Sequence, residues 1–242
     1  MGYLVLIRHG QPCSFEKDSD RLSPLGEEQA RTLAGYWIRQ GVSFDEVYSG
    51  ALVRQRRTAE IVEECFIQSG LSWPRLQITP ELNEYDSIGI INNLIPSLAG
   101  RDAAFRTLAE TFERNRDAPD RNDRNRHFQR MFEAVTSVWL GGEYEVEGVE
   151  SWRLFQSRVH AAIKRITSAE GGGRRVAVFT SGGVIGLAVQ NVLNAPERSA
   201  LEINWRVRNC SLTEFTFGRG RISLDSFNSI PHLDDPEMRT YR

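Results

Sequence analysis

Lysine is nearly absent from this sequence, because only Lys17 and Lys164 occur among the 30 basic residues. Arginine therefore carries almost all of the positive charge, which 32 acidic residues offset to a net charge of −2. Without an excess of positive charge, no binding to nucleic acid or to an acidic membrane surface is expected. Arginine suits phosphate oxyanions, but a bias that extends over the whole chain does not locate a site.

Cysteine is also scarce. Cys13, Cys65 and Cys210 have neither the spacing of metal ligands nor that of a disulfide framework, which indicates reduced thiols in a cytoplasm. No apolar run approaches the ~18 residues of a membrane span. Residues 1–10 are too short and too soon interrupted by charge to be a signal peptide. We therefore expect a cytoplasmic protein without a membrane segment.

Apolar runs and helical stripes alternate along the 242 residues. Strands are predicted at 3–7, 44–49 and 75–79, and helices at 23–38 and 51–68. Ser23 is the expected N-cap of the first helix, with Pro24 at its first position. This β-α-β-α-β order predicts a three-layer α/β/α sandwich with a mainly parallel sheet.

Residues 86–147 interrupt this alternation. Two helical patterns lie between 102 and 140, whereas the preceding segment with its proline is ambiguous. After it come a helix at 152–166, a buried strand at 175–180, another helix, and an antiparallel hairpin around the turn at 218–220. We interpret the chain as a single domain, 1–242, with a helical cap insertion at 86–147.

Polar side chains follow several of the predicted strands. Ligands of parallel sheets bind outside the carboxyl ends of the strands. If these ends converge, they bring together two guanidinium groups, an imidazole, a carboxyl group and free backbone N–H groups, which together suit a phosphoryl group. The residues are Arg8, His9 and Gly10 after the first strand, Ser49 and Arg54 after the second, Glu84 after the third, and Thr180, Ser181, Gly182 and Gly183 after the fourth.

Several motifs resemble the histidine phosphatase superfamily, in its phosphoglycerate-mutase-like branch (branch 1). They are "LIRHGQ", "LSPLGEEQA", "VYSGALVRQRRTAE", "EGVESW" followed by "SRVHAAIKRI", and "FNSIPHL". Arg-His-Gly alone would be a weak signal, but the set in this order is specific. The resemblance covers the chain except roughly 86–140, where family members vary.

The resemblance implies a role for each matching residue. His9 would attack phosphorus and become a phosphohistidine, while Arg8 and Arg54 would bind the equatorial oxygens. Glu84 would protonate the leaving oxygen as the general acid. No metal or organic cofactor is needed, because arginines supply the positive charge, and the partner would be a small phosphorylated substrate. Further pocket contacts would come from Gln11, Ser14, Ser181 and Gly182.

The sequence departs from the family pattern at three places. Ser181 stands where the family has a second histidine followed by glycine, which points to a subgroup with Thr-Ser-Gly-Gly at this position. Arg57 replaces the usual glutamine. Gly89 lies one residue farther from Glu84 than is common, so that Asp86 is the alternative candidate for the acid.

We expect hydrolysis of phosphomonoesters through a phosphohistidine on His9. Phosphoglycerate-mutase-type phosphotransfer is one alternative. The other is a weakly active or inactive relative that binds a phosphorylated ligand, which Ser181 supports best. His232 is expected to pack the C-terminal segment. The natural substrate and the oligomeric state are not indicated, a dimer being one alternative.

Overall fold

The computed structural model describes residues 1–13, 19–115, 120–142, 148–168 and 172–241. They fall into two compact units, Met1–Glu84 with Arg158–Arg242, and Tyr85–Ser157. The strands are β1 (Gly2–Arg8), β2 (Glu46–Ser49), β3 (Leu76–Ile78), β4 (Arg175–Thr180), β5 (Leu212–Gly218) and β6 (Arg221–Ser229). The α-helices are α1 (Pro24–Arg39), α2 (Val53–Gln68), α3 (Ser87–Arg101), α4 (Ala103–Asn115), α5 (Arg121–Gly141), α6 (Trp152–Ser168), α7 (Gly182–Leu193) and α8 (Arg198–Asn204).

The first unit contains a six-stranded sheet in the order β3-β2-β4-β1-β5-β6. β1 pairs with β4 in parallel, and β2 is parallel to both β3 and β4. β5 is antiparallel to β1 and to β6, so it alone of these strands runs in the opposite direction. Arg219 and Gly220 turn the β5–β6 hairpin with positive φ angles of 51° and 75°. The predicted mainly parallel sheet and the late hairpin are both confirmed.

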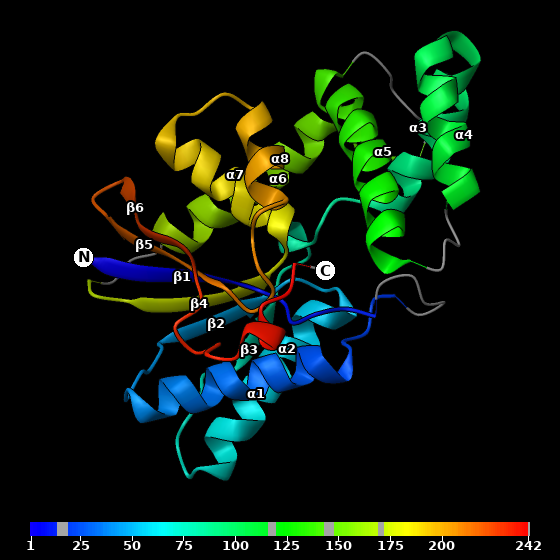
Figure 1. The fold of residues 1–242 in the computed structure, drawn as a ribbon. Coiled ribbons are helices and arrows are strands. Elements are labelled where there is room, and N and C mark those ends of the chain that lie inside the picture. The colour runs from blue at the N-terminus through cyan, green and yellow to red at the C-terminus, as the bar shows by residue number, and fades with distance from the viewer. Residues whose placement is uncertain (14–18, 116–119, 143–147, 169–171, 242) are drawn as a thin grey trace. The chain divides into compact units, whose positions relative to one another are not determined.

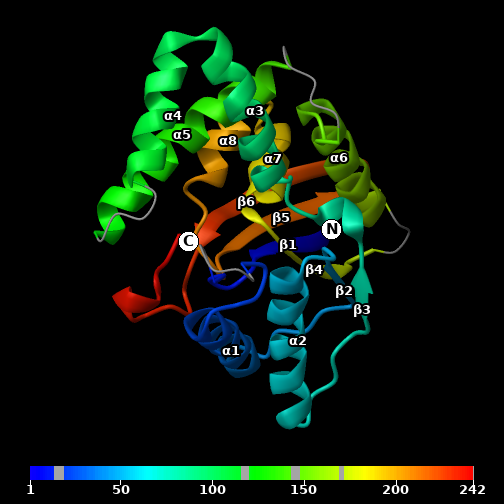
Figure 2. The same cartoon turned by 90° about the vertical axis from the view of Figure 1, so that its right-hand side faces the viewer.

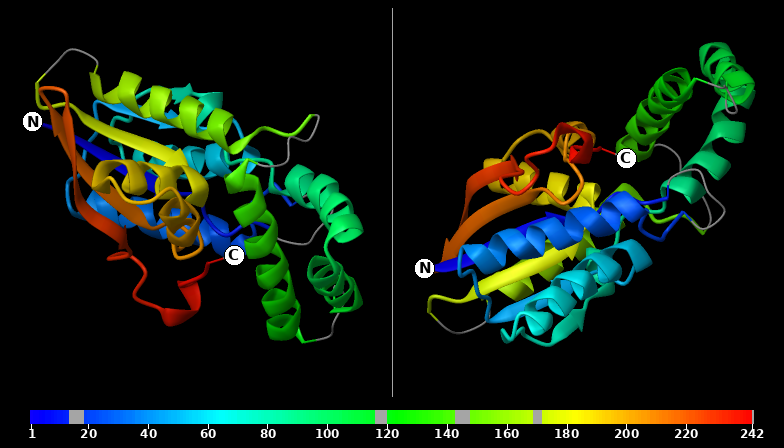
Figure 3. Two further views of the ribbon diagram at one scale, coloured as in Figure 1. Left: turned by 90° about the horizontal axis from the view of Figure 1, so that it is seen from above. Right: turned by 60° about the horizontal axis from the view of Figure 1, so that its bottom comes forward.

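Helices cover both faces of this sheet (Figure 1). α1 and α2 lie on one face, while α7, α8 and the 158–168 part of α6 lie on the other, as the turned view of Figure 2 also shows. The two views of Figure 3 show the same three layers from above and from below. The core on the α1 side includes Val5 and Ile7 of β1, Leu33 and Trp37 of α1, and Phe179 of β4.

The start of α1 follows its predicted capping pattern. The Ser23 hydroxyl accepts a hydrogen bond from the Gly26 amide at 3.0 Å, and Pro24 occupies the first helical position. The cap satisfies one of the amides that a helix start leaves without an internal partner. The predicted inward stripe is buried, as Leu33 and Trp37 illustrate. This helix start lies beside the loop after β1, since the Ser23 amide donates to the Gln11 carbonyl at 2.9 Å.

The second unit is helical and has its own aromatic core. Tyr85 packs on Trp139 with ring centroids 4.9 Å apart, and Trp139 meets Trp152 edge-on at 5.2 Å. The two helical patterns predicted between 102 and 140 correspond to α4 and α5. The segment with the proline forms α3, which contains Pro96 in its interior. No helix in the described ranges has the length and apolar character needed to cross a membrane.

Candidate active site

The carboxyl ends of three central strands of the first unit lie at one edge of the sheet. Arg8 of β1 is in register with Thr180 of β4, and Ser49 of β2 is in register with Phe179. The His9 amide donates to the Thr180 carbonyl at 2.9 Å, and the Gly50 amide donates to the Phe179 carbonyl at 3.1 Å. The turns that follow these strands are therefore neighbours, and they carry most of the candidate residues.

His9 is buried, with 3% of its surface exposed, and both of its ring nitrogens have partners. Nδ1 lies 2.7 Å from the Gly10 carbonyl oxygen, and Arg54 Nε donates to Nε2 at 3.1 Å. A carbonyl only accepts and a guanidinium only donates. The proton of the neutral ring therefore sits on Nδ1, and Nε2 presents its lone pair.

The surroundings of His9 also favour the neutral ring. Burial lowers its pKa well below the usual value, and the positive charges of Arg54 and Arg8 lower it further. The hydrogen bond to the Gly10 carbonyl acts in the opposite direction. An unprotonated imidazole with a fixed tautomer is the form that acts as a nucleophile.

Arg54, in the first turn of α2, is held by a carboxylate that the sequence analysis did not single out. Its Nη1 lies 2.6 Å from Asp20 Oδ1, and the other oxygen of Asp20 accepts from the Val53 amide at 2.8 Å. Asp20 thus bridges the guanidinium and the N-terminus of α2, where a negative charge is favourable. The structure brings Arg54 against His9, as the strand-end argument required.

Arg8 and Gly10 bracket His9 and are fixed through backbone contacts. Arg8 Nη1 donates to the Val207 carbonyl. The Gly10 amide donates to Thr58 Oγ1 at 3.1 Å. A Cβ at position 10 would lie 2.3 Å from the Gly26 carbonyl oxygen, so only glycine lets the loop after β1 approach the start of α1 this closely.

Gln11 is tied to α1 rather than left as a mobile side chain. Its backbone N–H donates to Gln29 Oε1 at 2.8 Å, and its side-chain oxygen accepts from the Ser23 hydroxyl at 2.8 Å. Gln29 also reaches the C-terminal segment, because its Nε2 donates to the Met238 carbonyl at 2.7 Å. Ser14, the other expected pocket contact of this loop, lies outside the described residues.

Glu84 ends the first part of the first unit and lies at the start of α7. Its Oε2 accepts from the Gly183 amide at 2.9 Å. Its loop is held from α6, because Arg158 Nη1 donates to the carbonyls of Glu81 and Asn83, both at 2.8 Å. The alternative acid, Asp86, is the N-cap of α3 and accepts from the Gly89 amide at 2.8 Å.

Ser181 and Gly182 follow β4 and are both buried. Gln55 Nε2 donates to Ser181 Oγ at 2.8 Å, a contact that the sequence analysis missed. A Cβ at position 182 would lie 2.2 Å from Asn204 Oδ1, so a larger residue there would displace the Asn204 side chain. His232 is buried too, and its ring lies 6.1 Å from that of Tyr36.

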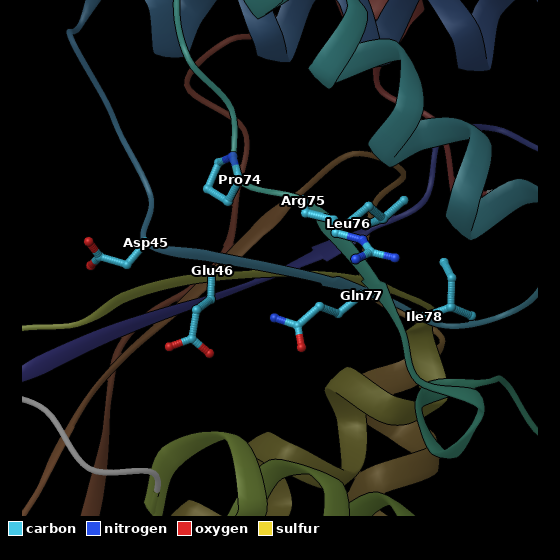
Figure 4. Close-up of a pocket in the computed structure, with 7 residues that line it drawn as sticks. All are labelled: Asp45, Glu46, Pro74, Arg75, Leu76, Gln77 and Ile78. Carbon is cyan, nitrogen blue, oxygen red and sulfur yellow. The ribbon is translucent and has the colours of Figure 1, made fainter.

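Two further observations concern what the described residues can bind. They contain no group of three or more His, Cys, Asp or Glu side chains that could hold a metal ion. An open pocket lies beside β3 and the start of β2, and Figure 4 shows its lining, which includes Asp45, Glu46 and Arg75. Glu46 Oε1 lies 2.6 Å from Arg174 Nη2, so the charge of this carboxylate is already paired within the protein.

Comparison with known proteins agrees with this geometry. A family model described as the histidine phosphatase superfamily (branch 1) matches residues 4–230. The 2,3-bisphosphoglycerate-dependent phosphoglycerate mutase of Nitratidesulfovibrio vulgaris is 38% identical over 91 residues, which are 35% of this chain and 35% of that protein. The match thus spans about a third of the length of this curated relative.

Solved structures share the fold over nearly their whole length. The phosphoglycerate mutase of Bacillus anthracis superposes with a TM-score of 0.64 at 19% identity, covering 96% of this chain and 95% of the other. The phosphoserine phosphatase of Entamoeba histolytica, in complex with 3-phosphoglyceric acid, gives 0.57 at 20% identity, covering 96% and 100%. With the family model extending over nearly the whole sequence, the chain belongs to the histidine phosphatase superfamily, branch 1.

Proposed function

We propose that this protein hydrolyses small phosphomonoesters through a phosphohistidine on His9. The observation that carries the proposal is the fixed tautomer of His9, whose Nε2 lone pair faces the Arg54 guanidinium. A phosphoryl group drawn to Arg54 and Arg8 would place its phosphorus in front of that lone pair, and the two cations would stabilise charge on its oxygens.

The proposed reaction has two steps. In the first, Nε2 forms a bond to phosphorus, the bond to the leaving oxygen breaks, and Glu84 gives that oxygen a proton. Arg54 Nε exchanges its bond with His9 for one to a phosphoryl oxygen. In the second step, water attacks the phosphohistidine, the ionised Glu84 takes a proton from that water, and free His9 and inorganic phosphate result. These two reaction steps need no metal or organic cofactor.

The alternative with a specific observation behind it is a mutase, the activity named for the relative that is 38% identical over 91 residues. We favour the hydrolase, because a mutase must retain a doubly phosphorylated intermediate. Ser181 supplies no positive charge for that purpose, and the Asp20 carboxylate lies 2.6 Å from Arg54. Adding 3-phosphoglycerate with 2,3-bisphosphoglycerate and measuring 2-phosphoglycerate against released phosphate separates the two activities.

The direct test of the proposal uses p-nitrophenyl phosphate. Wild-type protein should release nitrophenol, and a phosphorylated enzyme that is labile in acid and stable in base should be trapped by rapid quenching. His9→Ala should abolish both signals, whereas His127→Ala, a change on α5 in the other unit, should leave them intact. Equal turnover by wild type and His9→Ala would remove His9 from the mechanism.

We also propose a cytoplasmic location. The three cysteines, Cys13, Cys65 and Cys210, are all free thiols in the structure. Cytosolic proteins keep their thiols reduced. Localisation of a fluorescent fusion in cells would test this assignment, and export from the cytoplasm would contradict it.

A further inference from the structure

Gln55 of α2 links three segments around the site and is fully buried. Its Nε2 donates to the Leu82 carbonyl at 3.2 Å, in the loop that leads to Glu84, and to Ser181 Oγ at 2.8 Å. Its Oε1 accepts from the Leu52 amide at 3.3 Å, at the start of its own helix. The residue before it is Arg54, so the first turn of α2 carries both Arg54 and this link.

The orientation of the Gln55 amide is fixed by neighbours of known polarity. The Leu82 carbonyl can only accept, so the atom that faces it must be the nitrogen. The Leu52 N–H can only donate, so the atom that faces it must be the oxygen. Turning the amide over would create two repulsive contacts at once. The nitrogen therefore also faces Ser181, and Ser181 Oγ acts as the acceptor.

This arrangement leaves the proton of the Ser181 hydroxyl to be donated elsewhere. Ser181 is fully buried, and a buried donor without an acceptor is costly. The nearby Leu82 carbonyl already accepts from both Thr180 Oγ1, at 2.7 Å, and Gln55. Across the described ranges, Ser181 Oγ has one side-chain hydrogen-bond partner, Gln55, and it acts there as the acceptor.

Ser181 lies next to the candidate site in the chain, because it directly follows Thr180, whose carbonyl accepts from the His9 amide. Resting on the proposed function, we propose that Gln55 is a positioning residue that turns the Ser181 hydroxyl into a hydrogen-bond donor for the phosphoryl group on its way to His9. Charge on the phosphoryl oxygens would make this bond stronger than one between neutral groups.

A double-mutant cycle with p-nitrophenyl phosphate tests the proposal. Ser181→Ala should lower kcat/KM by about 100-fold, the lower end of the range for losing one donor to a developing charge. Gln55→Met keeps the length of the side chain but not the amide, and should lower it about tenfold. The double variant should be no slower than Ser181→Ala alone, because Gln55 acts only through Ser181.

Two further variants sharpen the cycle. Gln55→Glu offers an oxygen to Ser181, which would then donate its proton to the new carboxylate, so this variant should be as slow as Ser181→Ala. Gln190→Met is the matched control, because Gln190 is another buried glutamine whose Nε2 bonds a backbone carbonyl, that of Ala195. It should lower thermal stability without changing kcat/KM.

Calorimetry of inorganic phosphate binding to the same variants separates the proposal on Gln55 and Ser181 from the hydrolase proposal. Turnover that is unaffected by His9→Ala would defeat the hydrolase proposal, and phosphate affinity would still report on Ser181 and Gln55. If turnover depends on His9 but the effects of Ser181→Ala and Gln55→Met multiply, Gln55 has no role through Ser181. The inference also fails if Ser181→Ala changes neither kcat/KM nor phosphate affinity.

Discussion

Replacing Arg158 by methionine should lower kcat/KM most for the substrates whose leaving group most needs a general acid. Arg158 Nη1 donates to the carbonyls of Glu81 and Asn83, both at 2.8 Å, and it is these bonds that hold the loop before Glu84. Methionine keeps the aliphatic stem and removes both of these bonds, together with the longer one from Nη2 to the Glu84 carbonyl at 3.5 Å. Glu84 would then leave its place at the Gly183 amide more often.

The size of the effect follows from the two bonds. A hydrogen bond from a charged donor contributes about 1.5–3 kcal/mol, and because Arg158 is only half-buried we use the lower end, about 3 kcal/mol for the pair. Since 1.4 kcal/mol is about tenfold, the loss corresponds to a factor of about 10² in the population of the ordered loop. This lies within the ~10²–10⁴ that a general acid provides.

The assay compares two leaving groups. An alkyl phosphate releases a basic alkoxide and needs the acid, so Arg158→Met should lower its kcat/KM by about 10². p-Nitrophenyl phosphate releases a stabilised anion and should lose less than about tenfold. Glu84→Gln should give the same ranking with larger losses.

Arg165→Met is the matched control. Arg165 lies on the same helix and also reaches Glu81, but through an exposed ion pair at 3.3 Å with the side chain rather than through the backbone. Exposed ion pairs contribute little to stability, so this variant should have the kcat/KM of wild type for both substrates. Equal losses for both substrates in Arg158→Met, or losses as large in Arg165→Met, would refute the reasoning.

Two other predictions concern charge. Burial lowers the pKa of His232 to about 4, so the folded protein binds the proton less readily than the unfolded chain, whose histidine has a pKa of about 6.5. The free energy of unfolding should therefore fall as the pH decreases from about 6.5 to 4, by about 3 kcal/mol in all. His232→Phe should therefore show a flatter stability profile than wild type in urea unfolding between pH 7.5 and 4.5, and parallel profiles would contradict this. Asp20→Asn removes the carboxylate that competes with a phosphoryl group for Arg54, and should tighten competitive inhibition by inorganic phosphate about two- to tenfold; weaker inhibition would mean that Asp20 instead orders Arg54 for binding.

Local patterns in the sequence were enough to predict most elements of the sheet unit. The cap at Ser23, the buried stripe of α1 and the apolar run of β1 depend on neighbouring residues, and all are found in the structure. The same argument placed Arg8, His9 and Arg54 after strands whose ends meet. Helix α8 escaped notice because it is only seven residues long, and Pro96 concealed the helical character of α3.

The supporting contacts of the site could not be read from the sequence. Gln55 and Ser181 are separated by 126 positions, and nothing in either neighbourhood indicates the other. Asp20 precedes a predicted helix and would be taken for an exposed loop residue. A carboxylate or an amide gains such a role only from the tertiary fold, whereas glycine, proline and apolar periodicity act locally.

The place of β1 in the sheet has a consequence for biosynthesis. Among the strands of this sheet β1 is translated first, yet its two neighbours are β4 and β5, made more than 160 residues later. The Asn209 side chain, which donates to the His9 carbonyl, arrives later still than β4. The apolar segment that precedes His9 therefore has neither neighbouring strand until β4 and β5 have been made, and we expect it to bind a nascent-chain chaperone during that time.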